Sequence, residues 1–117
     1  MSTLTRRFAD SYVEITNAEQ YDQLATLFAE ESTFLAPDGR IFNGRQEIGE
    51  FYETFLPKMK GKIRLASFVE QGNSCVYELE AKLQGEGEYL LSAIDHATLD
   101  EDGLVTRFAV YTRVTGR

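Results

Sequence analysis

The spacing of apolar residues along the chain changes at about residue 63, from a helical period to strict alternation. In the first half, apolar side chains recur every three or four positions through residues 3–16, which predicts a helix there. Asn17, followed three positions later by Gln20, has the spacing of a capping box and predicts a second helix. The apolar residues of these two helices are Leu4, Phe8, Tyr12, Ile15, Tyr21, Leu24, Leu27 and Phe28.

Two short apolar runs flank Pro37, Asp38 and Gly39. This sequence is typical of a turn, because proline presets one backbone angle and glycine tolerates a positive one, so we expect a short hairpin. The segment RQEIGEFYETFL then returns to helical spacing and predicts a third helix, which Pro57 and Gly61 should end. Its apolar face carries Ile48, Phe51, Tyr52 and Phe55.

From residue 63 onward the alternation is typical of strands with two different faces. Turn sequences at residues 71–73, 84–88 and 100–103 divide this half into four antiparallel strands. Helices followed by strands predict one α+β domain over residues 1–117, with three N-terminal helices packed on one side of a curved, mainly antiparallel sheet.

Composition narrows the classes of function. The formal charge of −7 argues against nucleic acid as a partner, and we interpret the one basic cluster, Lys58, Lys60 and Lys62, as a solvated loop. A single cysteine, Cys75, and a single histidine, His96, exclude an intramolecular disulfide and a multi-histidine metal site, so we expect no metal or other cofactor. We find neither a signal peptide nor an apolar run of membrane-spanning length, and we expect a cytoplasmic protein.

Asp95 interrupts an otherwise apolar face of a predicted strand, which carries Leu91, Ala93, Ala97 and Leu99. A carboxyl group on such a face needs a partner or a proton, because burial disfavours its charged form and raises its pKa. Asp95 is therefore a candidate hydrogen-bond donor in its protonated form. The alternative is a structural role, as an anchor for a neighbouring loop.

Three blocks of sequence, taken in order, carry a family resemblance. They are SYVEITNAEQYDQLATLFAEES, then APDGRIFNGRQEIGEFY, then LLSAIDHATLDEDGLV. In this combination the chain resembles the ketosteroid isomerase-like branch of the nuclear transport factor two-like, or SnoaL-like, superfamily. The resemblance implies a cone-shaped fold around an apolar pocket. It is less specific for chemistry, because such folds carry many unrelated activities.

The resemblance also implies roles for individual residues. It places Tyr12 where steroid isomerases have an oxyanion-hole tyrosine, Asp95 where they have a protonated aspartic acid, and Tyr52 at a supporting tyrosine. In those enzymes a neutral acid and a phenol donate to one substrate oxygen, which stabilises an enolate where water is excluded. Tyr12 could instead be a core residue whose hydroxyl bonds a backbone carbonyl.

The chain departs from the isomerase pattern at the general base. Those enzymes have an aspartate directly before a proline, whereas Ala36 precedes Pro37 here, and Phe28 stands where some members have another tyrosine. Asp38 is the candidate for a displaced base, although the turn sequence would carry it to the tip of the hairpin. We interpret Cys75 as a small core residue and His96 as a residue of the opposite sheet face.

These observations lead to two hypotheses of different class. In the first, the pocket binds a small hydrophobic carbonyl or phenolic compound through Tyr12 and Asp95, with isomerase- or cyclase-like chemistry in which Asp38, a water or the substrate itself moves the proton. The expected pocket wall comprises Phe28, Ala36, Phe51, Tyr52, Phe108, Val110 and Thr112. In the second, the chain is a non-catalytic binding or dimerisation module whose Tyr12 and Asp95 satisfy each other as a core pair.

The second face of the predicted sheet mixes apolar and charged residues, too apolar to be wholly solvated and too charged for a core. We expect a homodimer interface there, since closed two-fold dimers are the commonest assembly. This face carries Val76, Leu90, Ile94, Ala109 and Tyr111 together with Glu78, Glu80, His96, Arg107 and Arg113.

Overall fold

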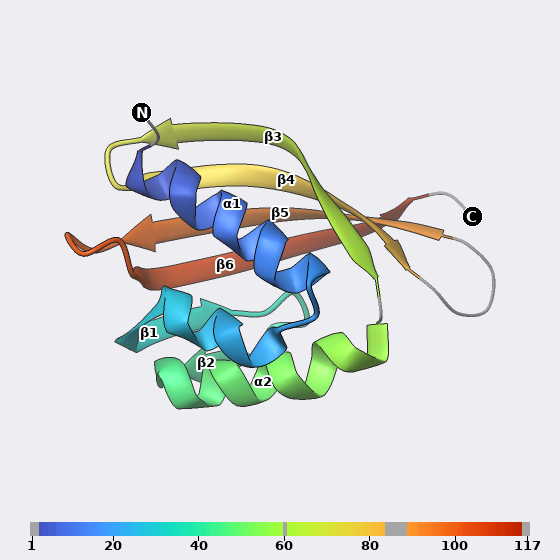
Figure 1. Ribbon diagram of the computed structural model, residues 1–117, viewed down its shortest axis with the longest axis horizontal. Coiled ribbons are helices and arrows are strands. Elements are labelled where there is room, and N and C mark those ends of the chain that lie inside the picture. The colour runs from blue at the N-terminus through green and yellow to red at the C-terminus, as the bar shows by residue number, and fades with distance from the viewer. Residues whose placement is uncertain (1–2, 60, 84–88, 116–117) are drawn as a thin grey trace.

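The computed structural model describes residues 3–59, 61–83 and 89–115 (Figure 1). The elements in chain order are the helix α1 (Leu4–Asn17), the 3-10 helix η1 (Tyr21–Leu27), β1 (Phe28–Leu35), β2 (Ile41–Asn43), α2 (Gly44–Met59), β3 (Lys62–Gln71), β4 (Ser74–Leu83), β5 (Tyr89–Leu99) and β6 (Val105–Thr115).

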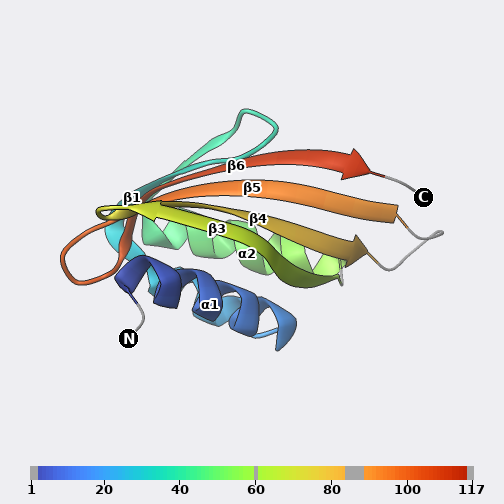
Figure 2. The same cartoon turned by 90° about the horizontal axis from the view of Figure 1, so that it is seen from above.

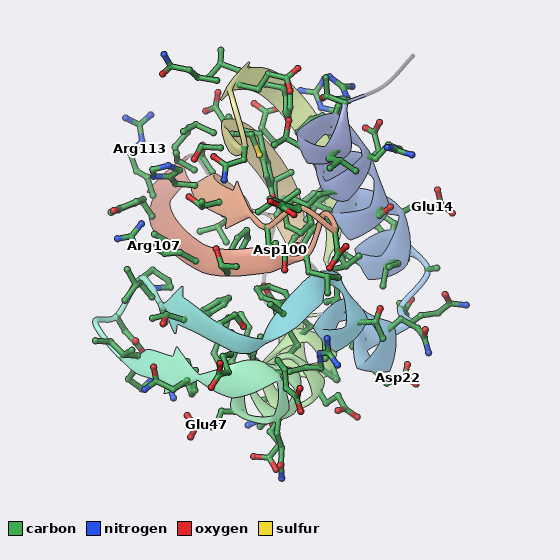
Figure 3. The ribbon with its side chains drawn as sticks, turned by 90° about the vertical axis from the view of Figure 1, so that its left-hand side faces the viewer. Glu14, Asp22, Glu47, Asp100, Arg107 and Arg113 are labelled. Atoms are coloured by element: carbon green, nitrogen blue, oxygen red, sulfur yellow. The ribbon has the colours of Figure 1, made fainter. Side chains whose placement is uncertain are left out.

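The six strands form one curved, mixed sheet in the order β2-β1-β6-β5-β4-β3. All neighbouring pairs are antiparallel except β1 and β6, which run parallel. The helices cover one face of this sheet, and Figure 2 shows α1 and α2 on the same side of it. The other face carries Arg107 and Arg113, which project away from α1, whereas Glu14 projects from α1 on the opposite side (Figure 3).

The four antiparallel strands and the hairpin that the sequence predicts are confirmed. Leu35 pairs with Ile41, and the turn between them closes through hydrogen bonds from Ala36 N to Arg40 O and from Gly39 N to Ala36 O. Gly39 has φ +93°, the positive angle that makes glycine the suitable residue there. The predicted turn at residues 84–88 lies outside the described residues.

Three details of the predicted helices are wrong. The second helix is a 3-10 helix, and the predicted hairpin, β1 and β2, separates it from α2. Asn17 caps no helix, because its side-chain amide instead bonds both backbone polar groups of Ile63, at 2.9 and 2.8 Å. Pro57 does not end α2, which continues to Met59; the missing N–H of proline costs a single backbone hydrogen bond near the end of the helix.

Two single residues lie where the pattern predicts them. Cys75 is buried in the core, and this burial raises the pKa of its thiol to about 11. His96 belongs to the opposite parity of β5 from Asp95, and it pairs with Val76 and Ala109 on the uncovered face.

The basic cluster is not a solvated loop. Lys58 lies in the last turn of α2, and Lys62 begins β3. The Lys62 ammonium donates to the backbone oxygen of Asn17 at 2.7 Å and pairs with Glu19 at 3.2 Å. Lys60 lies outside the described residues. Within the described part of the chain, neither helix is both long enough and apolar enough to cross a bilayer.

Candidate functional site

A cavity of about 300 Å³ lies between α1, α2 and the covered face of the sheet. Its volume is at the lower end of the range for pockets that take small molecules. Its wall is almost entirely apolar, and the polar groups are few. The lining residues are Tyr12, Thr16, Phe34, Ala36, Pro37, Asp38, Arg40, Phe51, Tyr52, Phe55, Leu56, Ile63, Leu79, Ala81, Leu91, Ala93, Asp95, Val110 and Thr112.

Asp95 faces this cavity from the middle of β5 and is 1 % exposed. It pairs with Tyr77 on β4 and with Val110 on β6. The nearby Tyr77 hydroxyl lowers the pKa of Asp95 and so opposes the effect of burial on that pKa. Neither that hydroxyl nor Asp95 Oδ1 has a well-formed hydrogen bond to a described residue. Burial dominates and raises the pKa of Asp95 to about 7, so the acid is largely protonated below neutral pH.

The second polar feature of the cavity is a pair of phenols. The hydroxyl oxygen of Tyr12 on α1 lies 2.9 Å from that of Tyr52 on α2, and both side chains are buried. Burial raises the pKa of both hydroxyls far above their ordinary value, with a further contribution from the nearby Asp95 charge. Both phenols therefore stay protonated, and one of the pair retains a proton to donate into the cavity.

The expected core pair between Tyr12 and Asp95 is not formed. Tyr12 bonds Tyr52 instead, and Asp95 Oδ1 is left without a partner among the described residues. The physical reason is that Tyr52 on α2 lies within hydrogen-bond distance of Tyr12, whereas Asp95 lies on the sheet rather than on a helix. Two donors thus face the same apolar space without satisfying each other.

At the mouth of the cavity the hairpin contributes Ala36, Asp38 and Arg40. Ala36 is buried, whereas Asp38 is exposed and accepts from the Arg40 backbone N at 3.0 Å and from its Nε at 2.7 Å. These contacts, the backbone hydrogen bond foremost, lower the pKa of Asp38. Its carboxylate is therefore a weaker base than an unpaired aspartate, and it lies at the rim rather than beside Asp95.

Of the remaining residues expected in the wall, Phe51, Val110 and Thr112 line the cavity, and two do not. Phe28 and Phe108 are fully buried one layer deeper, with ring centroids 5.5 Å apart. They support the wall through the rings of Tyr52 and Tyr12 respectively. Alternation assigned Phe108 to the core face correctly, whereas Phe28, predicted on the second helix, instead begins β1. Neither pattern carried information on how deeply these rings are buried.

Two polar groups near the cavity were not singled out from the sequence. Tyr77 on β4 pairs with Asp95 on β5. The sequence could have predicted this pairing, because the two residues are equally distant from Glu86 and would lie opposite each other in a hairpin centred there. Thr16 follows Tyr12 by one helical turn and so shares its face, a signal that was equally available. In the described part of the chain, no three potential acidic, histidine or cysteine metal ligands come together.

Comparison with known families gives one match. The profile described as a SnoaL-like domain matches residues 9–108, which is most of the chain. No curated protein matches at a significant level.

Solved structures match over nearly the full length. A candidate ketosteroid isomerase from Kribbella flavida superposes with a TM-score of 0.81 at 19 % identity, covering 97 % of this chain and 81 % of that one. A computationally designed 17-OHP binder gives 0.79 at 14 % identity, with 100 % of both chains covered. A protein of ketosteroid isomerase-like fold from Catenulispora acidiphila, in complex with trimethylamine, gives 0.78 at 14 %, covering 89 % and 83 %. At these identities the likeness shows the fold alone.

Proposed function

Because this chain belongs to the SnoaL-like domain family, whose profile it matches over residues 9–108, we propose that its cavity is a binding site for a small, mainly apolar carbonyl compound. The observation that carries the proposal is Asp95, a buried acid that lines an apolar cavity with one oxygen unpartnered. A buried polar atom without a partner is costly, and it is commonly found where a ligand supplies the partner.

In this proposal the ligand oxygen accepts two hydrogen bonds. Protonated Asp95 donates one, and Tyr12 donates the other while its own oxygen accepts from Tyr52. A carbonyl oxygen has two lone pairs and is the matching acceptor. Phe34, Phe51 and the other apolar side chains then bury the body of the ligand.

The same two donors would favour isomerase- or cyclase-like chemistry. A base removes a proton from the carbon next to the carbonyl group, the electron pair of that C–H bond moves onto the carbonyl oxygen, and the resulting enolate returns the pair when a proton is delivered to carbon. Donors fixed in an apolar site stabilise the oxygen as its charge develops. Asp38 is the acidic side chain at the mouth, and its pairing with Arg40 makes it a modest base, so any activity should be slow.

The competing function is a binding or dimerisation module without catalysis. Ala36 supports it, because no carboxylate occupies the position before Pro37. In this case the cavity would hold a ligand but would not turn it over. The exposed position of Asp38 and its pairing with Arg40 favour this outcome more than they favour efficient isomerisation.

The proposal is tested by calorimetric binding of 2-acetylnaphthalene, whose ketone oxygen can only accept hydrogen bonds. Affinity should fall by about thirtyfold between pH 6 and pH 8.5 as Asp95, whose pKa is about 7, loses its proton, and Asp95→Asn should abolish this dependence. Asp38→Asn is the matched control and should keep it. No binding, or affinity that rises with pH as expected for a cation on an ionised carboxylate, would refute the proposal.

We also propose a homodimer through the uncovered sheet face. Ile94 pairs with Tyr111, and these side chains are 36 % and 60 % exposed. Glu78 pairs with Ile94, and Arg113, which Figure 3 shows on the same face, pairs with Ser92, so this face carries both signs of charge beside its apolar residues. Leu90, expected on this face, has a side chain outside those described.

A further inference from the structure

Thr16 has a buried hydroxyl that the proposed donors do not use. The residue lies in the last turn of α1, is 5 % exposed and lines the cavity. Its Oγ1 has no hydrogen-bond partner among the described residues. A threonine in a helix ordinarily bonds the carbonyl oxygen four residues back, and this one does not. The hydroxyl is therefore available to a group within the cavity.

The apolar space continues past Thr16. A smaller cavity of about 80 Å³ shares Thr16, Phe55, Leu56 and Ile63 with the main one and extends it toward Tyr21 and Gly61. Thr16 thus lines both cavities. A ligand whose body fills the main cavity could therefore also place an atom beside Thr16.

We propose that Thr16 is a second polar contact for the ligand, so that the preferred compound carries a second oxygen in addition to its carbonyl group. This inference rests on the proposed function, because it takes the first oxygen to lie at Tyr12 and Asp95. Tyr12 and Thr16 are four residues apart on one helix, which is about 6 Å along its axis. A hydroxyl group both donates and accepts, so the second group is an alcohol, a phenol or a further ketone.

The experiment uses 2-acetylnaphthalene and its derivatives with a hydroxyl group at ring position 5, 6 or 7, so that the second oxygen is scanned across the cavity. The wild type should bind at least one hydroxylated isomer about fivefold to tenfold more tightly than the parent ketone, the gain of one additional hydrogen bond. Thr16→Val has nearly the same shape but no hydroxyl, and it should abolish that preference. Thr16→Ser keeps the hydroxyl and should retain it.

The parent ketone provides the internal control, and its affinity should be the same in the wild type, Thr16→Val and Thr16→Ser. If it binds with the pH dependence of Asp95 but no isomer gains in affinity, or if the gain persists in Thr16→Val, the Thr16 contact is refuted while the proposed function stands. If the parent ketone does not bind the wild type, the proposed function fails and this inference fails with it. Thermal unfolding of each variant shows that it is folded.

Discussion

The hydroxyl oxygens of Tyr12 and Tyr52 lie 2.9 Å apart and join α1 to α2 at the wall of the cavity. This bond fixes the Tyr12 phenol beside the space that Asp95 faces from the sheet. The two helices and the sheet thus each supply a polar group to a mainly apolar site.

The phenol pair should show energetic coupling. Tyr12→Phe and Tyr52→Phe each leave the other hydroxyl buried without its partner, so each should destabilise the fold by about 1 kcal/mol. The double variant should cost little more than either single one, giving a coupling of about 1 kcal/mol in a denaturant-unfolding cycle. Additive costs would show that the bond contributes nothing. Tyr12→Phe should weaken ketone binding more than Tyr52→Phe, since Tyr52 acts through Tyr12.

Asp95 should make the protein less stable as pH rises. The folded pKa is about 7, above the ordinary value of 3.8 that the unfolded chain has, so the unfolded chain binds fewer protons between these values. Stability from this residue is complete below pH 3.8 and is lost as pH rises through 7. The total loss is about 4 kcal/mol.

Asp95→Asn isolates this effect, because its side chain has nearly the same shape and does not ionise. The variant should match the wild type near pH 4 and exceed its free energy of unfolding by a margin that grows up to pH 8. Urea unfolding of both proteins at each pH measures the difference. If the difference in free energy of unfolding stayed constant across this pH range, the pKa of Asp95 would not be raised in the folded protein.

Ala36→Asp should introduce a base where the isomerase pattern has one. Ala36 lines the cavity, so a carboxylate there would reach a bound ketone more directly than Asp38 does from the rim. Deuterium uptake by the enolisable ketone 2-tetralone, followed by NMR, should accelerate by about two to four orders of magnitude. Ala36→Asn is the control for size and should not accelerate it. Equal rates in the two variants would argue against enolate stabilisation in this cavity.

The dimer proposal predicts a specific sensitivity. Tyr111→Glu places a charge on the exposed apolar part of the uncovered face and should shift sedimentation toward the monomer without lowering monomer stability. Leu4→Glu alters another exposed apolar residue, which lies on α1 and is 43 % exposed, and should leave the assembly unchanged. A dimer that tolerates Tyr111→Glu, or a wild type that is already monomeric, would exclude this interface.

The sequence predicted best those features that depend on neighbouring residues alone, namely strand faces and turns. Alternation has a period of two, so it correctly placed Asp95 on the covered face and His96 on the other. Pro37 and Gly39 specified their turn through backbone angles alone. For the same reason the covered face of the sheet and the hairpin could be anticipated without structural information, whereas fewer than half of the residues that line the cavity were expected there.

Long-range geometry could not be anticipated in this way. The parallel pairing of β1 with β6 joins segments about seventy residues apart, as in Phe34 with Phe108, and no local pattern encodes it. Asn17 has a suitable sequence for a helix cap, but β3 supplies better partners in the backbone of Ile63. The absence of a Tyr12 to Asp95 bond likewise depends on how closely α2 approaches α1.

The most direct test is the protonation of Asp95 itself, followed through its carboxyl carbon by NMR in the free and the 2-acetylnaphthalene-saturated protein. We expect Asp95 to titrate near pH 7 in the free protein. Its pKa should rise further on saturation, because the ketone binds only the protonated acid. A carboxyl group that titrates near its ordinary value, or one whose pKa does not change when the ketone binds, would contradict the role of Asp95 as the donor in this cavity.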